Sequence, residues 1–450
     1  MKSLDRRDLL HVGCSTLFGL TLPRIMSAAT NASNSAKPKS VILVLQSGGC
    51  PQMDSFDPKP DGPSETKGEF GAIQTKTPGM LFSDQLPHLA KVSDKFAIVR
   101  TMAHGDNRHL SATHHALTGM AQIFRGNANE DKELSRLDRP SYGSALEYLR
   151  PSTNGLPSQV TAPLPLIEGS LTWPGQHSGF LGPKFDPWII NSDPSTEEFK
   201  VDGVQLVDGM TTSRLKNRKG LLEDLNSQKQ SLDRLARKQQ FTSQQEVAFN
   251  LLTSGKLTGA CDIHAESDEL RDRYGRNKYG QTLLLARRMV ENGVPFVQAN
   301  MGHVQSWDTH VENFPKLKGH LLPGVDQGVS ALITDLEERG LIDDVLIVVV
   351  GEFGRSPRIS TLPNATVPGR DHWAYVYSAL FAGGGVRGGQ VIGKSDHQGG
   401  HPTTTPYSPD DMGATIYNTL GINPHAEIID HQDRPMRLSE GNVMNVLYTG

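Results

Sequence analysis

The sequence predicts an α/β fold, a three-layer sandwich with a largely parallel central sheet. Two observations support this prediction. Short, uniformly apolar runs such as residues 345–350 recur along the chain, and such runs are typical of strands that are buried on both faces. In the second half of the chain, segments with helical periodicity separate these runs, and this alternation is typical of a parallel sheet covered by helices.

The individual elements follow from the same patterns. The expected strands span residues 41–45, 96–99, 294–300, 345–350 and 377–381. The expected helices span residues 111–117, 281–292, 320–339 and 410–420. Gly119 lies two residues after the first of these helices and is typical of a helix C-terminus. In sheets of this kind, ligands bind beyond the carboxyl ends of the strands, so we expect a site in the loops that follow them.

The N-terminus has the order of an export signal. In residues 1–29 a pair of arginines precedes a moderately apolar segment that ends in small residues. Because two glycines interrupt the apolar segment, the twin-arginine route is favoured, and we expect an exported protein of the periplasm or cell envelope. An ordinary N-terminal helix is the alternative. We expect a linker over residues 30–40 and a single α/β domain over residues 41–450.

Two segments of this domain depart from the alternation of strands and helices. Residues 150–210 are rich in proline, glycine, serine and tryptophan. We expect a long insertion there, whose Trp173 and Trp188 form a wall of the pocket. Residues 214–252 carry leucines at helical spacing among many charges, and we expect a helical segment that covers the sheet.

Composition argues against two broad classes of protein. Basic and acidic residues nearly balance, at 45 against 49, so nothing indicates a nucleic-acid-binding protein. The chain lacks a run of about eighteen apolar residues, so we expect no transmembrane span. Two cysteines, Cys50 and Cys261, lie outside the expected export signal, and the sequence allows a disulfide between them. Their spacing excludes a zinc ribbon. The oligomeric state is not defined by the sequence.

Carboxylates and imidazoles gather next to the expected strands, in five separate segments. They include Asp54 and Asp57 after the first strand, His104 and His109 after the second, Asp308 and His310 after the third, Glu352 after the fourth, and Asp371 and His372 before the last, and Arg355 follows Glu352. We expect these side chains to meet at one edge of the sheet. Oxygen and imidazole ligands together suit a divalent metal ion, with zinc as the first choice and calcium, magnesium or manganese as alternatives.

The predicted metal ligands are Asp54, Asp308, His310, Glu352 and His372. Taken singly, these residues have simpler explanations. Asp308 can cap a helix, Glu352 can cap a loop, and His372 can pack beside Trp373. The convergence of five segments favours the metal site over these alternatives.

A second concentration of histidine lies in residues 102–119, which hold His104, His109, His114 and His115 among the sixteen histidines of the chain. Because imidazole titrates near neutrality and binds metals, this density indicates an active site. A solvated loop that runs into a helix is the alternative. His114 and His115, in the middle of the expected helix, are assigned structural roles.

Several stretches of the sequence belong together: the arginine pair, SGGCPQMDSFDPKP (47–60), HGDNRHLSATHHALTG (104–119), SWDTH (306–310), GEFGRSPR (351–358) and GRDHWAYVYSALFAGGGVRGGQVIG (369–393). They resemble a family of exported, functionally uncharacterised proteins of the alkaline phosphatase and sulfatase superfamily. The likeness covers nearly the whole chain. It implies an alkaline-phosphatase-like fold and metal-dependent hydrolysis of phosphate or sulfate esters, with one or two divalent ions. By position, Asp308, His310, Glu352 and His372 resemble the superfamily's metal ligands.

The chain also departs from the superfamily pattern. Ser47 stands where the first strand usually provides an aspartate ligand, so Asp54 would have to reach back into the site. Counting nine residues back from Thr118 reaches His109, where the superfamily carries its nucleophile. His109 is therefore predicted as a nucleophile, a proton shuttle or a metal ligand, with Ser111 and Thr113 as alternative hydroxyl nucleophiles. The sulfatase signature is absent, which argues against a formylglycine sulfatase.

Two functions are consistent with this pattern. The first is an exported metal-dependent hydrolase whose substrate is an anionic small-molecule or polysaccharide ester. In that case Arg355, with Arg108 or Arg370 as alternatives, would bind the anion in a bidentate manner. The second is a non-hydrolytic protein on the same fold that binds a metal or an anionic glycan. The replaced nucleophile and the missing first-strand aspartate favour this second function, and the fold alone does not decide between them.

Overall fold

The computed structural model describes residues 39–122, 133–201, 214, 217, 256–363 and 365–449. The expected export signal, most of the expected linker and nearly all of the expected helical segment at 214–252 lie outside the described residues. Those three expectations therefore remain predictions.

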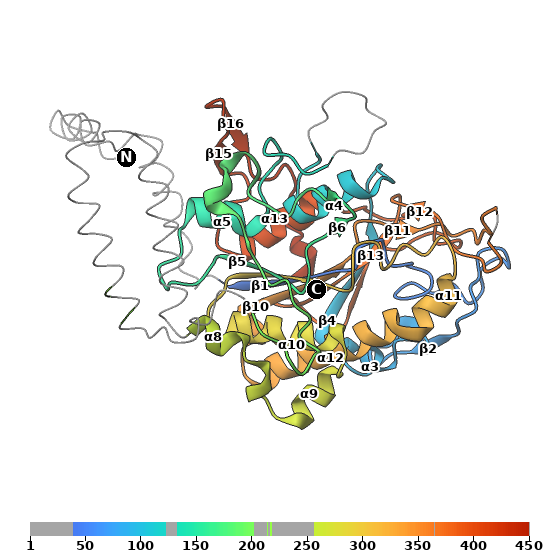
Figure 1. Ribbon diagram of the computed structural model, residues 1–450. Helices are drawn as coiled ribbons and strands as arrows, with labels where there is room; N and C mark the ends of the chain where they lie inside the picture. The colour runs from blue at the N-terminus through green and yellow to red at the C-terminus, as the bar shows by residue number, and fades with distance from the viewer. Residues whose placement is uncertain are drawn as a thin grey trace.

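The described part of the chain forms a central eight-stranded sheet with the order β14-β4-β13-β10-β1-β9-β5-β8 (Figure 1). Its strands are β1 Ser40–Leu45, β4 Phe96–Met102, β5 Gln159–Ala162, β8 Trp188–Ile189, β9 Phe296–Asn300, β10 Val345–Val350, β13 Tyr377–Gly383 and β14 Gln390–Ile392. All run in one direction except β13, which is antiparallel to both of its neighbours. The predicted α/β class with a largely parallel sheet is confirmed.

Helices cover both faces of this sheet. The described α-helices are α3 Pro87–Lys91, α4 His109–Thr118, α5 Tyr142–Leu149, α8 Lys256–Cys261, α9 Asp268–Tyr274, α10 Lys278–Glu291, α11 Asn313–Lys316, α12 Leu322–Glu338 and α13 Pro409–Thr419. Short two-stranded sheets lie outside the layers: β2 Ala72–Gln74 with β3 Leu81–Ser83, β6 Ile167–Glu168 with β7 Leu171–Thr172, β11 Gly354–Arg355 with β12 His372–Trp373, and β15 Glu427–Ile429 with β16 Pro435–Arg437.

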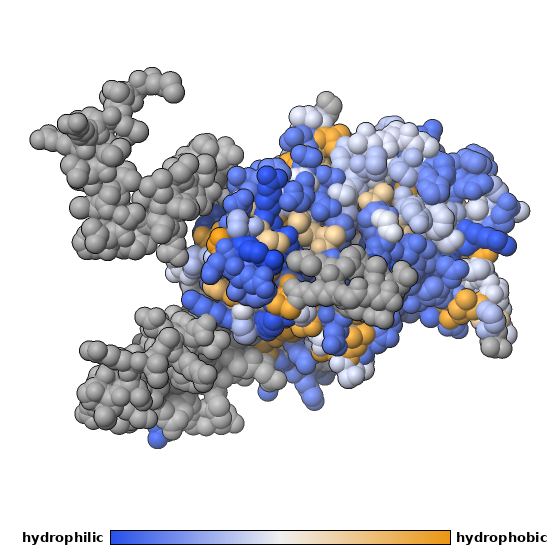
Figure 2. Space-filling view, turned by 90° about the horizontal axis from the view of Figure 1, so that it is seen from above, coloured by the Kyte–Doolittle hydropathy of each residue, from blue (hydrophilic) through white to orange (hydrophobic). Residues whose placement is uncertain are grey.

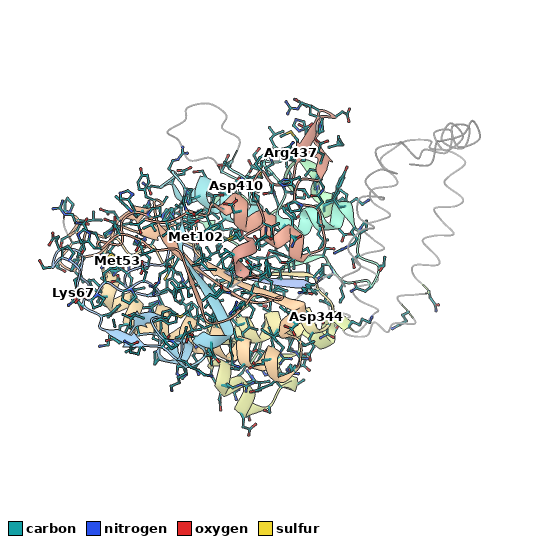
Figure 3. The ribbon with its side chains drawn as sticks, turned by 180° about the vertical axis from the view of Figure 1, so that it is seen from behind. Met53, Lys67, Met102, Asp344, Asp410 and Arg437 are labelled. Carbon is teal, nitrogen blue, oxygen red and sulfur yellow. The ribbon has the colours of Figure 1, made fainter. Side chains whose placement is uncertain are left out.

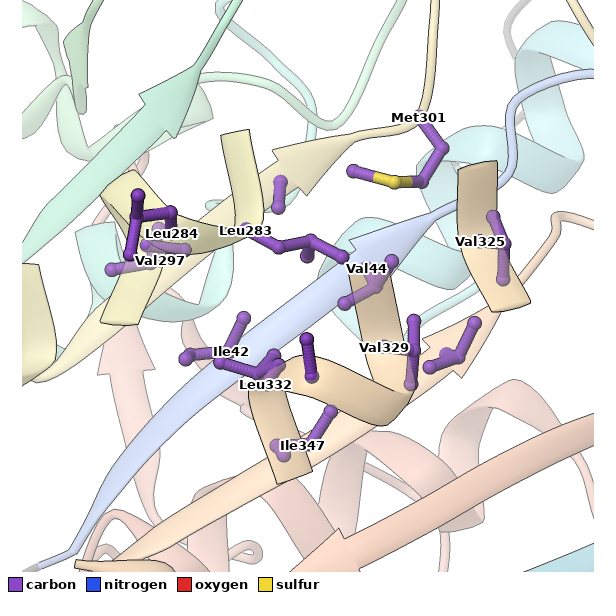
Figure 4. Packing of buried hydrophobic residues seen from close by; sticks show 14 of the residues in the cluster. Ile42, Val44, Leu283, Leu284, Val297, Met301, Val325, Val329, Leu332 and Ile347 are labelled. Carbon is purple, nitrogen blue, oxygen red and sulfur yellow. The ribbon is translucent and has the colours of Figure 1, made fainter. Parts of the chain in front are cut away.

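The three layers follow from the alternation of side chains along each strand. In β1, Ile42 and Val44 belong to the apolar cluster that contains the inner faces of α10 and α12 (Figure 4). Val41 and Leu43 belong to the opposite cluster, with apolar residues of α4, α5 and α13. Because both faces are covered, the inner strands are apolar at almost every position, and this is the pattern that made them recognisable in the sequence.

Residues 150–201, the described part of the expected insertion, contribute two strands to the central sheet. These are β5 and β8, and β5 pairs with β9 on one side and β8 on the other. All four residues of β5 are buried. These strands are too short to show a periodic pattern, which is why the sequence did not reveal them.

The direction of β13 brings one more loop to the site edge. In Figure 3, Met102 marks the end of β4, and Asp344, which precedes β10, marks the opposite edge of the sheet. Since β13 runs against the other strands, its amino end lies at the edge where they end. The residues before β13, including His372, therefore meet the loops that follow β1, β4, β9 and β10.

Surface and cysteine features complete the description. Among the described residues, no helix is both long and apolar enough to cross a membrane. The face seen in Figure 2 is mainly hydrophilic, with smaller apolar areas among the polar residues. Cys50 and Cys261 are both buried and free, so they do not form the disulfide that the sequence left open.

Candidate metal centre

Four side chains converge beyond the carboxyl ends of the strands: His109, Asp308, His310 and His372. Nε2 of His109 lies 3.3 Å from Oδ2 of Asp308. Nε2 of His310 and Nε2 of His372 each lie 3.2 Å from the other oxygen, Oδ1. One nitrogen or oxygen from each of His109, Asp308 and His372 falls within 4.8 Å of the others. Three imidazoles thus face one carboxylate.

Sequence and secondary structure explain how these residues meet. His109 is the first residue of α4, which ends at Gly119 in the left-handed conformation with φ 69°. A side chain there would meet Gly413 of α13, because its Cβ would lie 2.8 Å from the Cα of Gly413. The predicted C-terminus of this helix is confirmed, although the helix begins two residues earlier than expected. The first turn of α4 therefore places His109 at the site edge.

The Nδ1 atom of each imidazole has a hydrogen-bond partner on the side away from Asp308. Nδ1 of His109 lies 2.8 Å from Oε1 of Glu352, and Nδ1 of His310 lies 2.8 Å from Oδ1 of Asp371. Nδ1 of His372 lies 2.7 Å from the carbonyl oxygen of Asn107. Because carboxylates and carbonyls only accept hydrogen bonds, Nδ1 carries the proton in all three rings and Nε2 faces Asp308.

This arrangement fits a divalent metal ion. Nε2 of His109 is buried and faces Oδ2 of Asp308, and Nε2 of His310 lies only 2.9 Å from Nε2 of His372. Histidines that bind metals almost always donate their other ring N–H to a carboxylate or a backbone carbonyl, as these three do. The described residues thus provide three nitrogen donors and a carboxylate, all with supporting partners.

The charges of the cluster agree with this interpretation. Burial would raise the pKa of Asp308, but hydrogen bonds with His109 and His372 and the charge of Arg355 outweigh it and hold that pKa far below its usual range. Burial would lower the pKa of His109, yet its bonds with Asp308 and Glu352 raise that pKa to about 9. The site therefore stabilises a positive charge at His109, and a metal ion would compete there with the proton.

Two predicted metal ligands lie elsewhere. The carboxylate of Asp54 is buried and paired with Arg370, at 2.8 Å from Nε and 3.0 Å from Nη2, and it also accepts a 2.8 Å hydrogen bond from Asn313. Glu352 is fully buried behind His109, where both of its oxygens accept the N–H of Gly48. Both carboxylates are occupied by protein donors, so the structure places neither with the ligand atoms around Asp308.

The predicted catalytic residues also differ in position. Arg355 is buried, and its guanidinium bonds to the carboxylate of Asp308 and to the carbonyl of Gly48. The hydroxyl of Ser111 donates to Asp106 at 2.5 Å and is directed at that carboxylate, not at the cluster. Arg108 also contacts Asp106, with Nη2 at 2.7 Å from Oδ2.

Of the two tryptophans expected to form a wall of the pocket, one lies beside the cluster. The ring of Trp173 is buried, with its centroid 5.2 Å from that of His109. Phe353 lies against the same imidazole at 5.1 Å. Trp188, in β8 at the edge of the sheet, packs against the apolar cluster on the opposite face from α4. Two buried aromatic rings thus contact His109.

A family model described as "Protein of unknown function (DUF1501)" matches residues 38–447. The chain belongs to this family. No curated protein matches it. Membership in DUF1501 therefore assigns no activity, and any functional conclusion depends on the site itself.

Solved structures provide more distant comparisons for this DUF1501 chain. A sulfatase from Pseudoalteromonas sp. is 12% identical, with 93% of this chain and 72% of the other covered and a TM-score of 0.36. A phosphonate monoester hydrolase from Silicibacter pomeroyi is 13% identical, with 92% and 77% covered and a TM-score of 0.37. A protein of the alkaline phosphatase superfamily from Vibrio parahaemolyticus is 11% identical, with 86% and 68% covered and a TM-score of 0.37.

Sequence reasoning gave no supporting role to three residues that hold the side chains of this DUF1501 site. Gly48 was visible only as part of a glycine pair after the first strand, and Asp371 only as the neighbour of His372. Asn107 binds through its backbone carbonyl, so its side-chain type gave no signal at all.

Proposed function

We propose that this protein is an exported metal-dependent hydrolase of phosphate or sulfate esters. One observation carries the proposal: three imidazoles, each with its proton fixed on Nδ1, direct Nε2 toward the single carboxylate of Asp308. The sequence resemblance to the alkaline phosphatase and sulfatase superfamily supports the class of substrate. The arginine pair at the N-terminus supports export.

His109, Asp308, His310 and His372 would hold the metal. Three imidazole nitrogens with one carboxylate match the donors that zinc prefers, whereas calcium and magnesium prefer oxygen donors. When bound, such an ion polarises an ester oxygen and stabilises the charge that develops on it. In this proposal His109 is a ligand and not the nucleophile, because its Nε2 points at the same carboxylate as the other two rings.

The remaining residues of the site orient and shield these groups. Arg355 fixes the carboxylate of Asp308, and Glu352 fixes the ring of His109. Trp173 and Phe353 exclude water from one side of that ring. Polar interactions are stronger where water is excluded, so a closed wall would favour binding of an anionic ester beside the cation.

Elemental analysis of protein purified without chelators tests the proposal. Wild type should contain near-stoichiometric metal, and Asp308→Ala or His372→Ala should lose it. His320→Ala is a matched control, because His320 is an exposed histidine on another segment. Metal-loaded wild type should then hydrolyse members of a panel of phosphate and sulfate esters. Wild type without metal, or Asp308→Ala with undiminished metal, would refute the proposed site.

A non-hydrolytic binding protein on the same site is the second candidate. The observation that favours it is that His109 occupies the position at which the superfamily carries its nucleophile. This candidate predicts metal that Asp308→Ala removes, no turnover of any ester in the panel, and metal-dependent binding of a sulfated or phosphorylated glycan by calorimetry.

A further inference from the structure

We infer that Glu352 and Gly48 act together as positioning residues that decide which nitrogen of His109 faces Asp308. The inference rests on the proposed function, in which Nε2 of His109 is a metal ligand. From its position after a strand, Glu352 was expected to be a metal ligand, and the inference assigns it a different role. Glu352 works through His109 and does not itself bind the cation.

The first step is the surroundings of Glu352. Its side chain is fully buried, and its Oε1 lies 2.8 Å from Nδ1 of His109. A carboxylate offers only acceptors, so Nδ1 must be the donor and Nε2 is left facing Asp308. A neutral amide at position 352 could present either a donor or an acceptor to the ring. The carboxylate of Glu352 therefore fixes which nitrogen of His109 carries the proton, whereas a neutral side chain of the same shape would leave both positions open.

The second step is the backbone of Gly48. Its N–H donates to both oxygens of Glu352, at 2.8 Å and 3.0 Å. Its carbonyl accepts a hydrogen bond from Arg355, and Arg355 in turn bonds to Asp308. One residue thus holds the partner of His109 through its N–H and the partner of Asp308 through its carbonyl oxygen.

The third step explains why this residue is glycine. Gly48 has φ +112°, and a Cβ there would lie 2.2 Å from the backbone nitrogen of Asp308. The neighbouring Ser47 binds the same loop, since its carbonyl accepts the N–H of Trp307 at 2.9 Å. At the end of β1, where the superfamily usually carries an aspartate ligand and this chain has Ser47, close backbone contacts position the other side chains of the site.

Glu352→Gln is the direct test, because glutamine has nearly the same shape. The N–H of Gly48 must meet an acceptor, so the amide oxygen would turn to Gly48 and the NH₂ group would turn to His109. Nδ1 would then have to accept, and the ring proton would move to Nε2, where it opposes metal binding. We expect metal affinity, measured with zinc and a competing chromophoric chelator, to fall about 10- to 100-fold.

A spectroscopic readout separates positioning from a general loss of structure. In ¹⁵N-histidine-labelled protein with chelator present, wild type should show a downfield N–H resonance from Nδ1 of His109, which His109→Asn removes. Glu352→Gln should lose the same resonance. Asp335→Asn is the matched control: this buried carboxylate pairs with Arg287 and Tyr274 on the other face of the sheet and should keep both the resonance and the zinc affinity.

The outcomes are distinct for the two proposals. Loss of the resonance together with weaker zinc binding in Glu352→Gln, but not in Asp335→Asn, supports the inference. Unchanged zinc affinity in a folded Glu352→Gln overturns it while leaving the metal site intact. A wild type that shows no such resonance also overturns it. A wild type that shows the resonance but binds no zinc refutes the proposed function, while the orientation of His109 by Glu352 stands.

Discussion

His310 and His372 approach each other through Nε2 atoms that are only 2.9 Å apart. Each ring has its Nδ1 proton committed elsewhere, His310 to Asp371 and His372 to the carbonyl of Asn107. Two neutral rings would therefore direct lone pairs at each other, next to the negative charge of Asp308. Such a contact is favourable only when a cation is shared by the two nitrogens, either as a proton or as a metal ion.

This relationship predicts that metal stabilises the folded protein. Because the unfolded chain lacks the preformed site, metal at about a hundredfold excess over its dissociation constant should add about 2.7 kcal/mol to the free energy of unfolding. Chelator should lower the melting temperature of wild type, and zinc should restore it. Differential scanning fluorimetry with and without chelator measures both changes.

The matched variants make this prediction specific. His310→Ala should melt at the same temperature with and without chelator, because it has lost the paired nitrogen. His320→Ala should respond to chelator as wild type does. If chelator leaves the melting temperature of wild type unchanged, the 2.9 Å contact is bridged by a proton and not by a metal.

A second prediction concerns Asp54 and Arg370, a fully buried ion pair. Asp54→Ala leaves the guanidinium of Arg370 buried without its carboxylate, so we expect the free energy of unfolding to fall by about 3–5 kcal/mol. Urea titration monitored by circular dichroism measures this loss. The folded fraction of Asp54→Ala should keep its metal. Loss of metal from a folded Asp54→Ala would return Asp54 to the set of ligands.

The contrast between Asp54 and Asp308 shows what the sequence could predict. Both were expected at the metal because both follow a buried strand, and the apolar runs located those strands correctly. Position after a strand brings a carboxylate to the correct edge of the sheet but does not determine its partner there. Asp54 pairs with Arg370, a residue more than three hundred positions away, as their separation of 316 shows. That pairing left no local pattern in the sequence.

His109 and Glu352 illustrate the same limit. The sequence singled out both, but it left three roles open for His109 and expected Glu352 to be a ligand. Their roles depend on a single contact between Nδ1 and Oε1, which forms only when α4 and the loop after β10 pack together. His310 and His372 lie at the expected edge of the sheet, because His310 follows β9 and His372 precedes β13, whose antiparallel direction brings it there.

A third prediction compares two tryptophans. Trp173 lies against His109, whereas Trp188 packs on the opposite face of the sheet. Trp173→Phe should reduce turnover of an ester substrate by up to about 100-fold, because small displacements of positioned groups can cost that much. Trp188→Phe should keep wild-type turnover. Steady-state kinetics on the best substrate of the ester panel measures both, and equal effects of the two substitutions would exclude a role for Trp173 in the site.

The last prediction concerns stability in acid. His114 is fully buried, and burial, as the largest cause, lowers its pKa from 6.5 to about 3. Burial likewise lowers the pKa of His177 to about 4. Between pH 6.5 and these values the unfolded chain binds more protons than the folded chain, so stability falls as the pH is lowered through this window. Each histidine contributes up to about 1.4 kcal/mol per pH unit.

Urea unfolding at about pH 7 and about pH 5 measures this dependence, and His114→Gln isolates one histidine. The comparison is needed because burial raises the pKa of Asp326 to about 6, which favours folding as the pH falls and opposes the histidines. His114→Gln has no imidazole to protonate at this position, so it should lose less stability between the two pH values than wild type. His320→Gln, with an exposed side chain, should lose as much as wild type. Equal losses in His114→Gln and wild type would mean that His114 is protonated in the folded state, which its complete burial opposes.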